Sequence, residues 1–291
     1  SKPAQHSEIA TLSADAFKTP IEKALHIRTG NIVTFEQEKQ VRNPDSIVLF
    51  EHMSNFSHLG KFAFTAQGFA TSDNPPFVRS FWEFPSIFHG WIPVLSAPPK
   101  FAEFSGRSDL LFWEDGQGSY YRHAMSLKEE GRLGGWKSGA EAWDHRGILV
   151  SEMGQMAATI YTGEMFDHTA HALIPRQDEF MTPIWCYASS SEFREVIRKF
   201  SQKLNITNET LAKVPFDLSR WQRIAKEKYP NGLPAPSSDN PTQWLFNGRP
   251  DGSARPLQVA VARLLGYRWP RQTGSSFMDC PALGPDGLEK L

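Results

Sequence analysis

The sequence is poor in cysteine and has no long apolar run. Its two cysteines, Cys186 and Cys280, lie far apart, and neither has a Cys or His at metal-ligand spacing, so no metal site is expected. Without a disulfide framework, a reducing cytoplasm is the expected location. No apolar stretch approaches the roughly 18 residues of a membrane-spanning helix, and the opening "SKPAQHSEIA" lacks the apolar centre of a signal peptide, so no membrane partner is expected.

The chain also has no excess of charge of either sign. Its 31 Lys and Arg face 32 Asp and Glu, which gives a net charge of -1. The bulk charge therefore predicts no polyanion partner, and binding to nucleic acid would have to rest on a local cluster of cations.

Turn-forming and aromatic residues are abundant. The 21 Gly, 21 Pro, 21 Phe and 9 Trp favour a loop-rich protein with strands over a helical bundle. A length of 291 residues allows one large domain or two modest ones. Because Ser1 replaces an initiator Met and the closing "GPDGLEKL" stops as a helical pattern begins, we expect a piece of a longer protein.

Alternating polar and apolar positions predict short strands early in the chain, at "NIVTF" and "SIVLF", with a brief helix at "IEKALHI". Irregular strands and loops are predicted over 62–113. Residues 115–147, dense in Gly, Lys, Arg and Trp, predict a long polar loop, and long ordered loops are often functional. Strand-like stretches follow at "GILVSE", "AATIYTG" and "AHALIP".

The clearest helical pattern covers residues 190–204, where apolar side chains recur on one stripe. Ser189 and Glu192 match a capping box, which would satisfy amide donors at the start of the helix. The opposite face is a local basic ridge within a nearly neutral chain. Its members are Arg194, Arg198, Lys199 and Lys203.

Two more helices are predicted towards the C-terminus. After a loop "NITNETLAK" and a short strand at "VPFDL", one helix is predicted to start at Asp217 or Ser219. A turn-rich linker covers roughly 230–256. The last helix, "PLQVAVARLLGY", would begin with Pro256 at its first position, where proline is well tolerated.

The tetrad Asn74-Pro75-Pro76-Phe77 spells the catalytic signature of amino-group DNA methyltransferases, in which the Asn and a Pro carbonyl bind a flipped-out base and the aromatic residue stacks on it. That tetrad normally ends a buried parallel strand, whereas "AQGFATSD" before it is polar and turn-like. No Gly-rich turn follows an apolar strand anywhere in the chain. Asn-Pro-Pro is also ordinary turn chemistry, so a turn is favoured and a catalytic tetrad is the alternative.

Other chemistries have weaker signals. His168 and His171 are spaced like metal ligands but have no third ligand at characteristic spacing, so a structural pair is favoured. Carboxylates near tryptophans leave a glycoside hydrolase or carbohydrate-binding module as a distant alternative. The aromatic residues Phe77, Phe81 and Trp82 are predicted to be core residues.

Several longer segments resemble one specific family. "GFATSDNPPFVRSFWE" resembles a block of roughly G-x-x-T-G-D-N-x-x-F-x-R-x-W-E, with Ser72 where the family prefers Gly. That block lies downstream of the catalytic domain in large adenine-specific DNA methyltransferases, namely type IIG restriction-modification enzymes and the methylases of the phage-defence systems BREX and DISARM. "LNITNETLAKVPFDL" and "LQVAVARLLGYRWP" are similar to further blocks, and the resemblance covers about residues 35–270.

The resemblance implies a target recognition domain. Its implied fold is α+β, with a mixed, largely antiparallel curved sheet, long loops and a helical C-terminal part. Residues 1–216 would form the recognition domain and 217–291 a helical tail and linker. The chain would bind double-stranded DNA without catalysis of its own, and the catalytic methyltransferase domain of the parent chain would be its partner and would bind S-adenosylmethionine.

The resemblance also suggests site residues. Basic side chains would contact phosphates and set register, while loop side chains would bind base edges. The expected phosphate contacts are Arg122, Lys128, Arg132, Lys137, Arg198 and Lys203. The expected base contacts are Arg146, Gln155, Asn205, Thr207 and Asn208, although Asn208 could equally cap or turn its loop. Asp73, Asn74, Phe77 and Arg79 would belong to the family block and have a structural or docking role.

Overall fold

The computed structural model describes residues 8–14, 16–38, 57–84, 89–132, 134–201 and 203–273. The chain divides into two compact units, Ser1–Ser57 and His58–Leu291. In the first unit, β1 (Glu8–Thr11) pairs antiparallel with β2 (Val33–Glu36), and α1 (Pro20–Thr29) connects them. The predicted strand at "NIVTF" and helix at "IEKALHI" are confirmed, whereas "SIVLF" lies outside the described residues. The predicted functional boundary at 216/217 stays a prediction.

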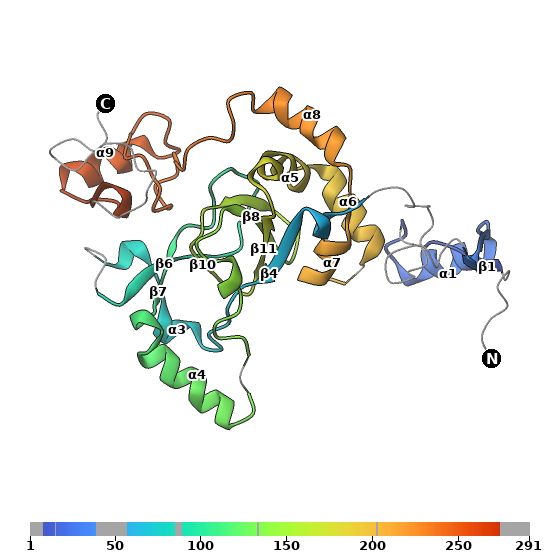
Figure 1. Ribbon diagram of the computed structural model, residues 1–291, viewed down its shortest axis with the longest axis horizontal. Coiled ribbons are helices and arrows are strands. Elements are labelled where there is room, and N and C mark those ends of the chain that lie inside the picture. Colours follow the sequence, from blue (N-terminus) through green and yellow to red (C-terminus); the bar gives the residue numbers. More distant parts are fainter. Residues whose placement is uncertain are drawn as a thin grey trace. The chain divides into compact units, whose positions relative to one another are not determined.

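The second unit is built on two four-stranded sheets (Figure 1). The first has the order β4-β11-β8-β9 and is antiparallel throughout; its strands are Ala63–Gln67, Ala170–Pro175, Gly147–Ser151 and Ala158–Tyr161. The other has the order β10-β6-β7-β5, with one parallel pair, β10 with β6; its strands are Met165–Phe166, Trp91–Leu95, Asp109–Phe112 and Val78–Ser80. A two-stranded sheet joins β3 (Ser57–His58) and β12 (Pro215–Phe216). The predicted α+β class with largely antiparallel sheets is confirmed.

Three strands of the first sheet, β8, β9 and β11, are buried because they are nearly continuous apolar runs. All but the last residue of β8 and of β11, and all of β9, are buried. Such runs are typical of strands covered on both faces. Helix α5 (Met181–Ala188) packs on β8 and β11, and α7 (Asn208–Lys213) packs on β4.

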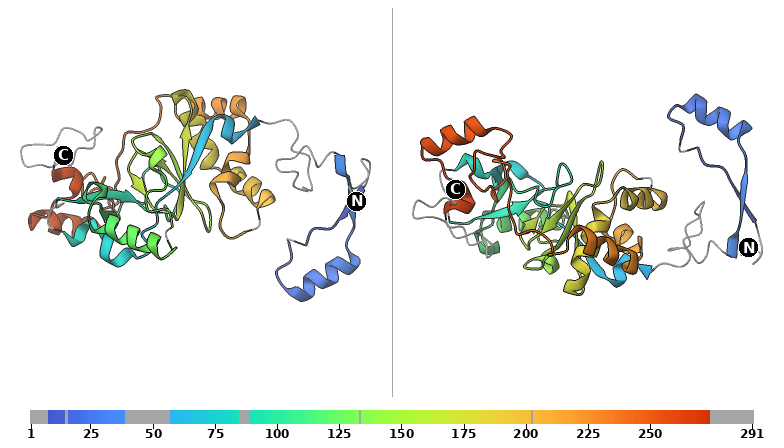
Figure 2. Two further views of the ribbon diagram at one scale, coloured as in Figure 1. Left: turned by 60° about the horizontal axis from the view of Figure 1, so that its bottom comes forward. Right: turned by 90° about the horizontal axis from the view of Figure 1, so that it is seen from above.

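Helix starts in the C-terminal half follow from local capping. Helix α8 (Leu218–Lys228) has Asp217 as its N-cap, whose carboxylate accepts from the Arg220 N–H at 3.0 Å. Helix α9 (Pro256–Leu264) begins with Pro256, as predicted. Helix α8, orange in Figure 2, packs on α5. Both predicted helices are confirmed.

The predicted helix over 190–204 differs at both ends. The observed helix, α6, covers Ser191–Phe200 and has Ser190 as its N-cap, whose hydroxyl accepts from the Phe193 N–H at 3.2 Å. The predicted cap Ser189 instead donates to the Trp185 carbonyl at 2.8 Å, which ends α5. Two adjacent serines therefore serve two different helices. Since α6 stops at Phe200, Lys203 lies in a loop.

Two predicted loops contain helices. Within 115–147, α4 (Ser119–Glu129) forms because Tyr120, Ala124 and Leu127 recur at helical spacing and bury one face. The Glu114 carboxylate accepts from the Ser119 N–H at 2.6 Å and so satisfies a donor at the helix start. In "NITNETLAK", α7 forms with Thr207 as its N-cap. In both stretches a loop was predicted from the polar composition, which hid the short apolar periodicity of the helix.

Shorter elements connect these parts. The four-residue helix α3 covers Asn74–Phe77, and the 3₁₀ turns are Leu59–Lys61, Phe81–Glu83 (η3), Glu114–Gly116, Ala140–Ala142, Asp178–Phe180 and Pro270–Thr273. Phe77 and Phe81 are buried as predicted, but Trp82 is 48% exposed, so its assignment to the core was wrong.

Candidate nucleic-acid interface

The turn between β8 and β9 and the loop after α6 meet in space, although they lie far apart in sequence. We call residues 152–156 together with 198–201 and 203–208 the loop surface. Arg198 connects the two segments, since its guanidinium donates to the Lys203 carbonyl at 2.6 Å and to the Gly154 carbonyl at 3.3 Å. Hydrogen bonds from a charged donor are stronger than neutral ones, so Arg198 fixes the spacing of the two loops.

A second set of contacts lies beneath the loop surface. The backbone N–H of Ile206 donates to the Glu152 carbonyl at 3.0 Å, and the Asn205 amide donates to the Glu152 carboxylate at 3.3 Å. His171 of β11 lies 2.9 Å from the Ile206 carbonyl through Nε2 and 3.9 Å from the Glu152 carboxylate. The buried sheet therefore holds the 203–208 loop against the turn.

Burial shifts the pKa of two of these groups, His171 and Glu152. Burial lowers the pKa of His171, because the charged imidazolium loses hydration, so the neutral form that donates from Nε2 to Ile206 is favoured. Burial also raises the pKa of Glu152; the nearby His168 opposes this shift and Asp167 adds to it. Neither group was among the predicted site residues. Glu152 carried no sequence signal of its role, and the spacing of His171 with His168 indicated only a structural pair.

The exposed part of the loop surface has a mixed composition. Gln155, Lys203 and Thr207 are exposed, as are the apolar Met153 (50%) and Leu204 (82%). At the tip of the turn the backbone takes a left-handed conformation at Gly154, with φ of 64°. The amide of Gln155 and the cation of Lys203 thus project from backbone that is fixed from below. Side chains of these types can hydrogen-bond base edges and phosphate oxygens.

Thr207 and Asn208 have local structural roles at the start of α7. The Thr207 hydroxyl accepts from the Thr210 N–H at 3.2 Å. The Asn208 side-chain oxygen accepts from the Glu209 N–H at 3.0 Å. The capping role considered for this loop therefore belongs mainly to Thr207, and both side chains direct an oxygen at the helix terminus.

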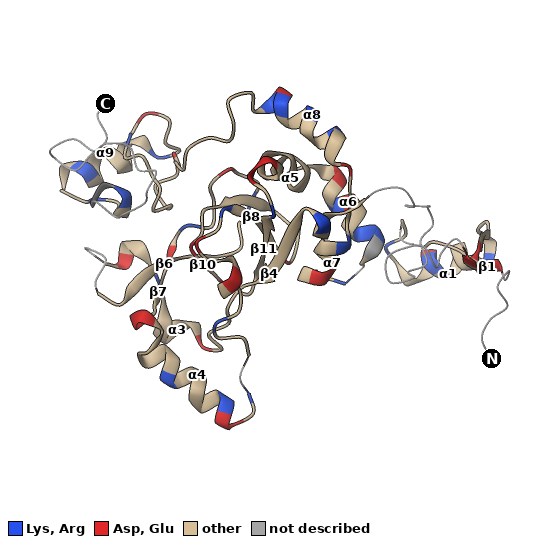
Figure 3. Ribbon diagram, viewed as in Figure 1, with Lys and Arg blue, Asp and Glu red and all other residues tan. Residues whose placement is uncertain are grey.

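The predicted phosphate contacts of the 115–147 region form a separate group on and after α4. Arg122 and Lys128 lie on α4, and Arg132 and Lys137 follow it; all four are exposed. Arg132 forms an ion pair with Glu130 at 3.1 Å. Figure 3 shows cations on α4 and on α6, with the loop residue Lys203 following the latter in the chain.

Arg146 lies away from the loop surface. It precedes β8, whereas Gln155 follows that strand, so the two stand beyond opposite ends of β8. Arg146 instead lines a polar cavity of about 420 Å³ together with Asp144 and Asp178. The predicted base contacts therefore do not all gather in one place.

The Asn74-Pro75-Pro76-Phe77 tetrad forms the helical turn α3, which starts after Asp73. The Thr71 hydroxyl donates to the Asn74 side-chain oxygen. Phe77 is buried against the rings of Tyr120 and His123, with centroids 5.3 and 5.2 Å away. A covered ring offers no face for a base to stack on.

The neighbouring arginine supports the same turn. Arg79 donates to the Pro75 carbonyl and forms an ion pair with Glu83 at 3.7 Å. The tetrad and the arginine thus shape the chain between α3 and η3. The docking role expected for this block stays a prediction.

Two further features concern the described residues as a whole. They contain no group of three or more His, Cys, Asp and Glu side chains placed to hold a metal ion. No helix among them is long and apolar enough to cross a membrane.

Comparisons with known proteins give only loose likenesses. No protein-family model and no curated protein sequence matches the chain. In structure the chain is similar to the HsdS subunit from Thermoanaerobacter tengcongensis, with TM-score 0.37 and 12% identity over 60% of this chain and 36% of that one. It is also similar to the type IIL restriction-modification enzyme MmeI in complex with DNA, with TM-score 0.33 and 12% identity over 70% of this chain and 38% of that one. The chain thus spans under two-fifths of either structure, and TM-scores below 0.5 establish neither a shared fold nor a shared function.

Proposed function

We propose that this chain is a sequence-reading module for double-stranded DNA that belongs to an adenine-specific DNA methyltransferase of a restriction-modification or phage-defence system. The observation that carries the proposal is the loop surface. Two segments about 45 residues apart bring Gln155, Lys203 and Asn205 together on one rigid support, held by Arg198. The sequence blocks quoted above support the family, and no catalytic role falls to this chain.

The contacts suggest that different residues bind phosphates, bind base edges and position the loops. Exposed Lys203 and the cations of the α4 group contact phosphates, which gives affinity without sequence information. Gln155 is exposed and can pair with an adenine edge in the major groove, while Asn205 has its amide nitrogen on Glu152 and presents its oxygen. Arg198 positions the two loops, because both its terminal nitrogens donate within the protein, and its remaining N–H groups are free to donate to a phosphate.

The rest of the enzyme would supply the chemistry. A catalytic domain outside this chain binds S-adenosylmethionine and receives the extruded adenine, while this module holds the duplex in register. A cytoplasmic location and fusion of the parent to a nuclease are parts of the same proposal.

The test is the affinity for a labelled 30-base-pair duplex, measured by anisotropy between 50 and 200 mM salt. Each lost phosphate contact should reduce the slope of log K against log salt by about 0.9. Lys203→Ala should therefore bind more weakly and with a shallower slope, whereas Arg223→Ala, an exposed arginine on α8, serves as the matched control. Salt-independent affinity, or equal slopes for the Lys203→Ala variant and the unaltered chain, would contradict the phosphate role.

The alternatives predict different ligands. A self-sufficient methyltransferase built on Asn74-Pro75-Pro76-Phe77 must bind S-adenosylmethionine, so calorimetry that detects no heat eliminates it. The buried Phe77 ring disfavours it already. A carbohydrate-binding module would bind on a glycan array and would show no affinity for duplex DNA.

A further inference from the structure

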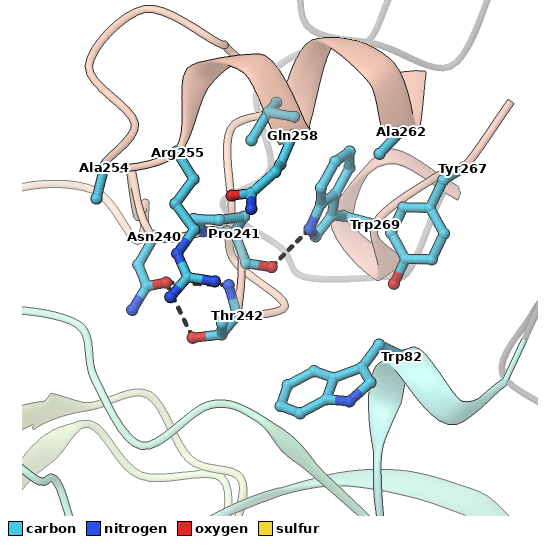
Figure 4. Close-up of a pocket in the computed structure, with 11 residues that line it drawn as sticks. Trp82, Asn240, Pro241, Thr242, Ala254, Arg255, Gln258, Ala262, Tyr267 and Trp269 are labelled. Atoms are coloured by element: carbon cyan, nitrogen blue, oxygen red, sulfur yellow. Dashed lines mark hydrogen bonds between the residues drawn. The ribbon is translucent and has the colours of Figure 1, made fainter. Parts of the chain in front are cut away.

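A cavity of about 520 Å³ opens between Trp82 of η3 and the segment 240–269 (Figure 4). Its volume lies within the range of about 300–1,000 Å³ that is usual for small-molecule sites. None of the residues predicted for DNA contact lines it. The cavity therefore needs an explanation separate from that of the loop surface.

The walls of this cavity are fixed by contacts outside it. On one side, Ser80 and Glu83 cap η3 reciprocally, and the Ser80 N–H donates to the Glu83 carboxylate at 2.9 Å. On the other, the indole of Trp269 is buried and donates to the Pro241 carbonyl at 2.6 Å. The Trp82 ring thus extends from a rigid turn toward a rigid wall.

The lining combines aromatic and hydrogen-bonding groups. In Figure 4 the half-exposed Trp82 ring lies opposite Tyr267 and Trp269. The rings of Tyr267 and Trp269 are arranged edge to face, with their centroids 4.8 Å apart. The amides of Asn240 and Gln258 also line the cavity. Asn240 is oriented by two hydrogen bonds, in which its side-chain oxygen accepts from the Thr242 N–H at 3.0 Å and hydroxyl at 2.9 Å. A ligand with a planar ring and polar edges could stack on the aromatic rings and hydrogen-bond to the amides.

The charge around the cavity favours an anion. Residues 240–271, which supply every lining residue except Trp82, contain five arginines and a single carboxylate, Asp251. Arg263 and Arg271 donate to backbone carbonyls, but Arg255 is exposed and lines the cavity. An aromatic peptide would use the rings and leave this cation without a partner, whereas a nucleotide uses both.

We propose that this cavity binds one nucleotide, with the base stacked on Trp82, its edge on Gln258 or Asn240, and its phosphate on Arg255. The nucleotide is either an unpaired residue of a DNA strand or a free nucleotide, which share this chemistry. The site goes beyond duplex recognition and does not depend on it, because it uses different residues.

The test uses a fluorescein-labelled thymidine dodecamer and, as competitor, thymidine 5′-monophosphate. Base stacking on an aromatic side chain is worth about 1–3 kcal/mol, so Trp82→Ala should weaken dodecamer binding about 5- to 150-fold. Trp82→Phe should retain most of the affinity. Arg255→Ala should weaken binding and reduce the salt slope by about 0.7, and Arg223→Ala should change neither.

If thymidine 5′-monophosphate displaces the dodecamer, the proposal holds and a free nucleotide is a sufficient ligand. If the dodecamer binds and the monophosphate does not displace it, the proposal holds with a DNA strand as the ligand. Binding of neither probe, or binding that Trp82→Ala and Arg255→Ala leave unchanged while thermal melting shows both variants folded, would overturn it. Duplex affinity of the same variants is measured in parallel. Weaker duplex binding by Lys203→Ala alone would support the loop surface as a DNA contact and would not affect the nucleotide-site proposal.

Discussion

Replacing Arg107 by methionine should be among the most destabilising single changes in the chain. The Arg107 side chain is fully buried and donates to the carbonyls of Ser105 at 3.3 Å and Ile160 at 2.9 Å, and to the Thr162 hydroxyl at 2.8 Å. Its Nε lies 3.5 Å from the Glu164 carboxylate, whose side chain is 10% exposed. Burial lowers the pKa of Arg107, and Glu164 opposes that shift.

The magnitude follows from what Arg107→Met leaves behind. Removing one partner of a buried ion pair costs about 3–5 kcal/mol, since the other charge remains without compensation. For a domain of this size about 2–4 °C are lost per kcal/mol, so the melting temperature should fall by about 6–20 °C. Removing both charges in Arg107→Met/Glu164→Leu should restore part of the loss, because an apolar pair of similar volume is often as stable as the ion pair.

Urea unfolding followed by tryptophan fluorescence measures these differences. Arg223→Met, an exposed arginine on α8, is the matched control and should stay within about 0.5 kcal/mol of the unaltered protein. A loss below about 1 kcal/mol for Arg107→Met, or a double variant less stable than the single one, would refute the role given to the buried pair.

The remaining predictions concern the loop surface and the buried thiol. Arg198→Ala should lower the free energy of unfolding by about 1–2 kcal/mol and weaken duplex binding, and Arg198→Lys should not restore binding; full recovery with lysine would mean that charge alone matters. Because burial depresses the pKa of His171, the unfolded chain binds the proton first, so stability should fall as pH drops below about 6.5. His171→Gln should flatten this dependence in urea midpoints between pH 7 and 5.5, and an unchanged profile would contradict it. Burial raises the pKa of Cys186, so in a Cys280→Ser background its thiol should react with a disulfide reagent at least about ten times more slowly than in urea; equal rates would place it at the surface.

The pH dependence of the loop surface has a second contributor of opposite sign. The raised pKa of Glu152 means that the folded chain binds its proton first, so stability should rise as pH falls through that pKa. Glu152→Gln removes this contribution and keeps an acceptor for Asn205. Midpoints of the two single variants and their combination therefore separate the histidine from the carboxyl.

Elements with local signals could be predicted from the sequence. Helices α8 and α9 have an Asp cap and an N-terminal proline, and β8, β9 and β11 are apolar runs. Helix α4 could not, because only three buried positions interrupt a polar stretch that is rich in turn formers. Its formation depends on a core around Phe77 that the distant β6 and β7 complete.

The candidate sites depended on contacts that sequence does not display. Gln155 and Asn205 were predicted separately, each from its position near a loop tip. They share one surface because Arg198 donates a hydrogen bond to the carbonyl of Gly154, 44 residues away in the sequence. Trp82 was expected in the core because aromatic residues usually are buried. Trp82 instead lines a cavity together with the segment 240–269, which no local pattern connects to it.

Selection from a randomised duplex library tests the central claim most directly, because it measures sequence choice and not affinity alone. The unaltered chain should enrich one defined motif. Gln155→Ala, which removes an exposed base-contacting amide, should relax one position of that motif, at a cost in discrimination of about 1–3 kcal/mol. Binding that persists while no motif is enriched at any salt concentration would contradict the account.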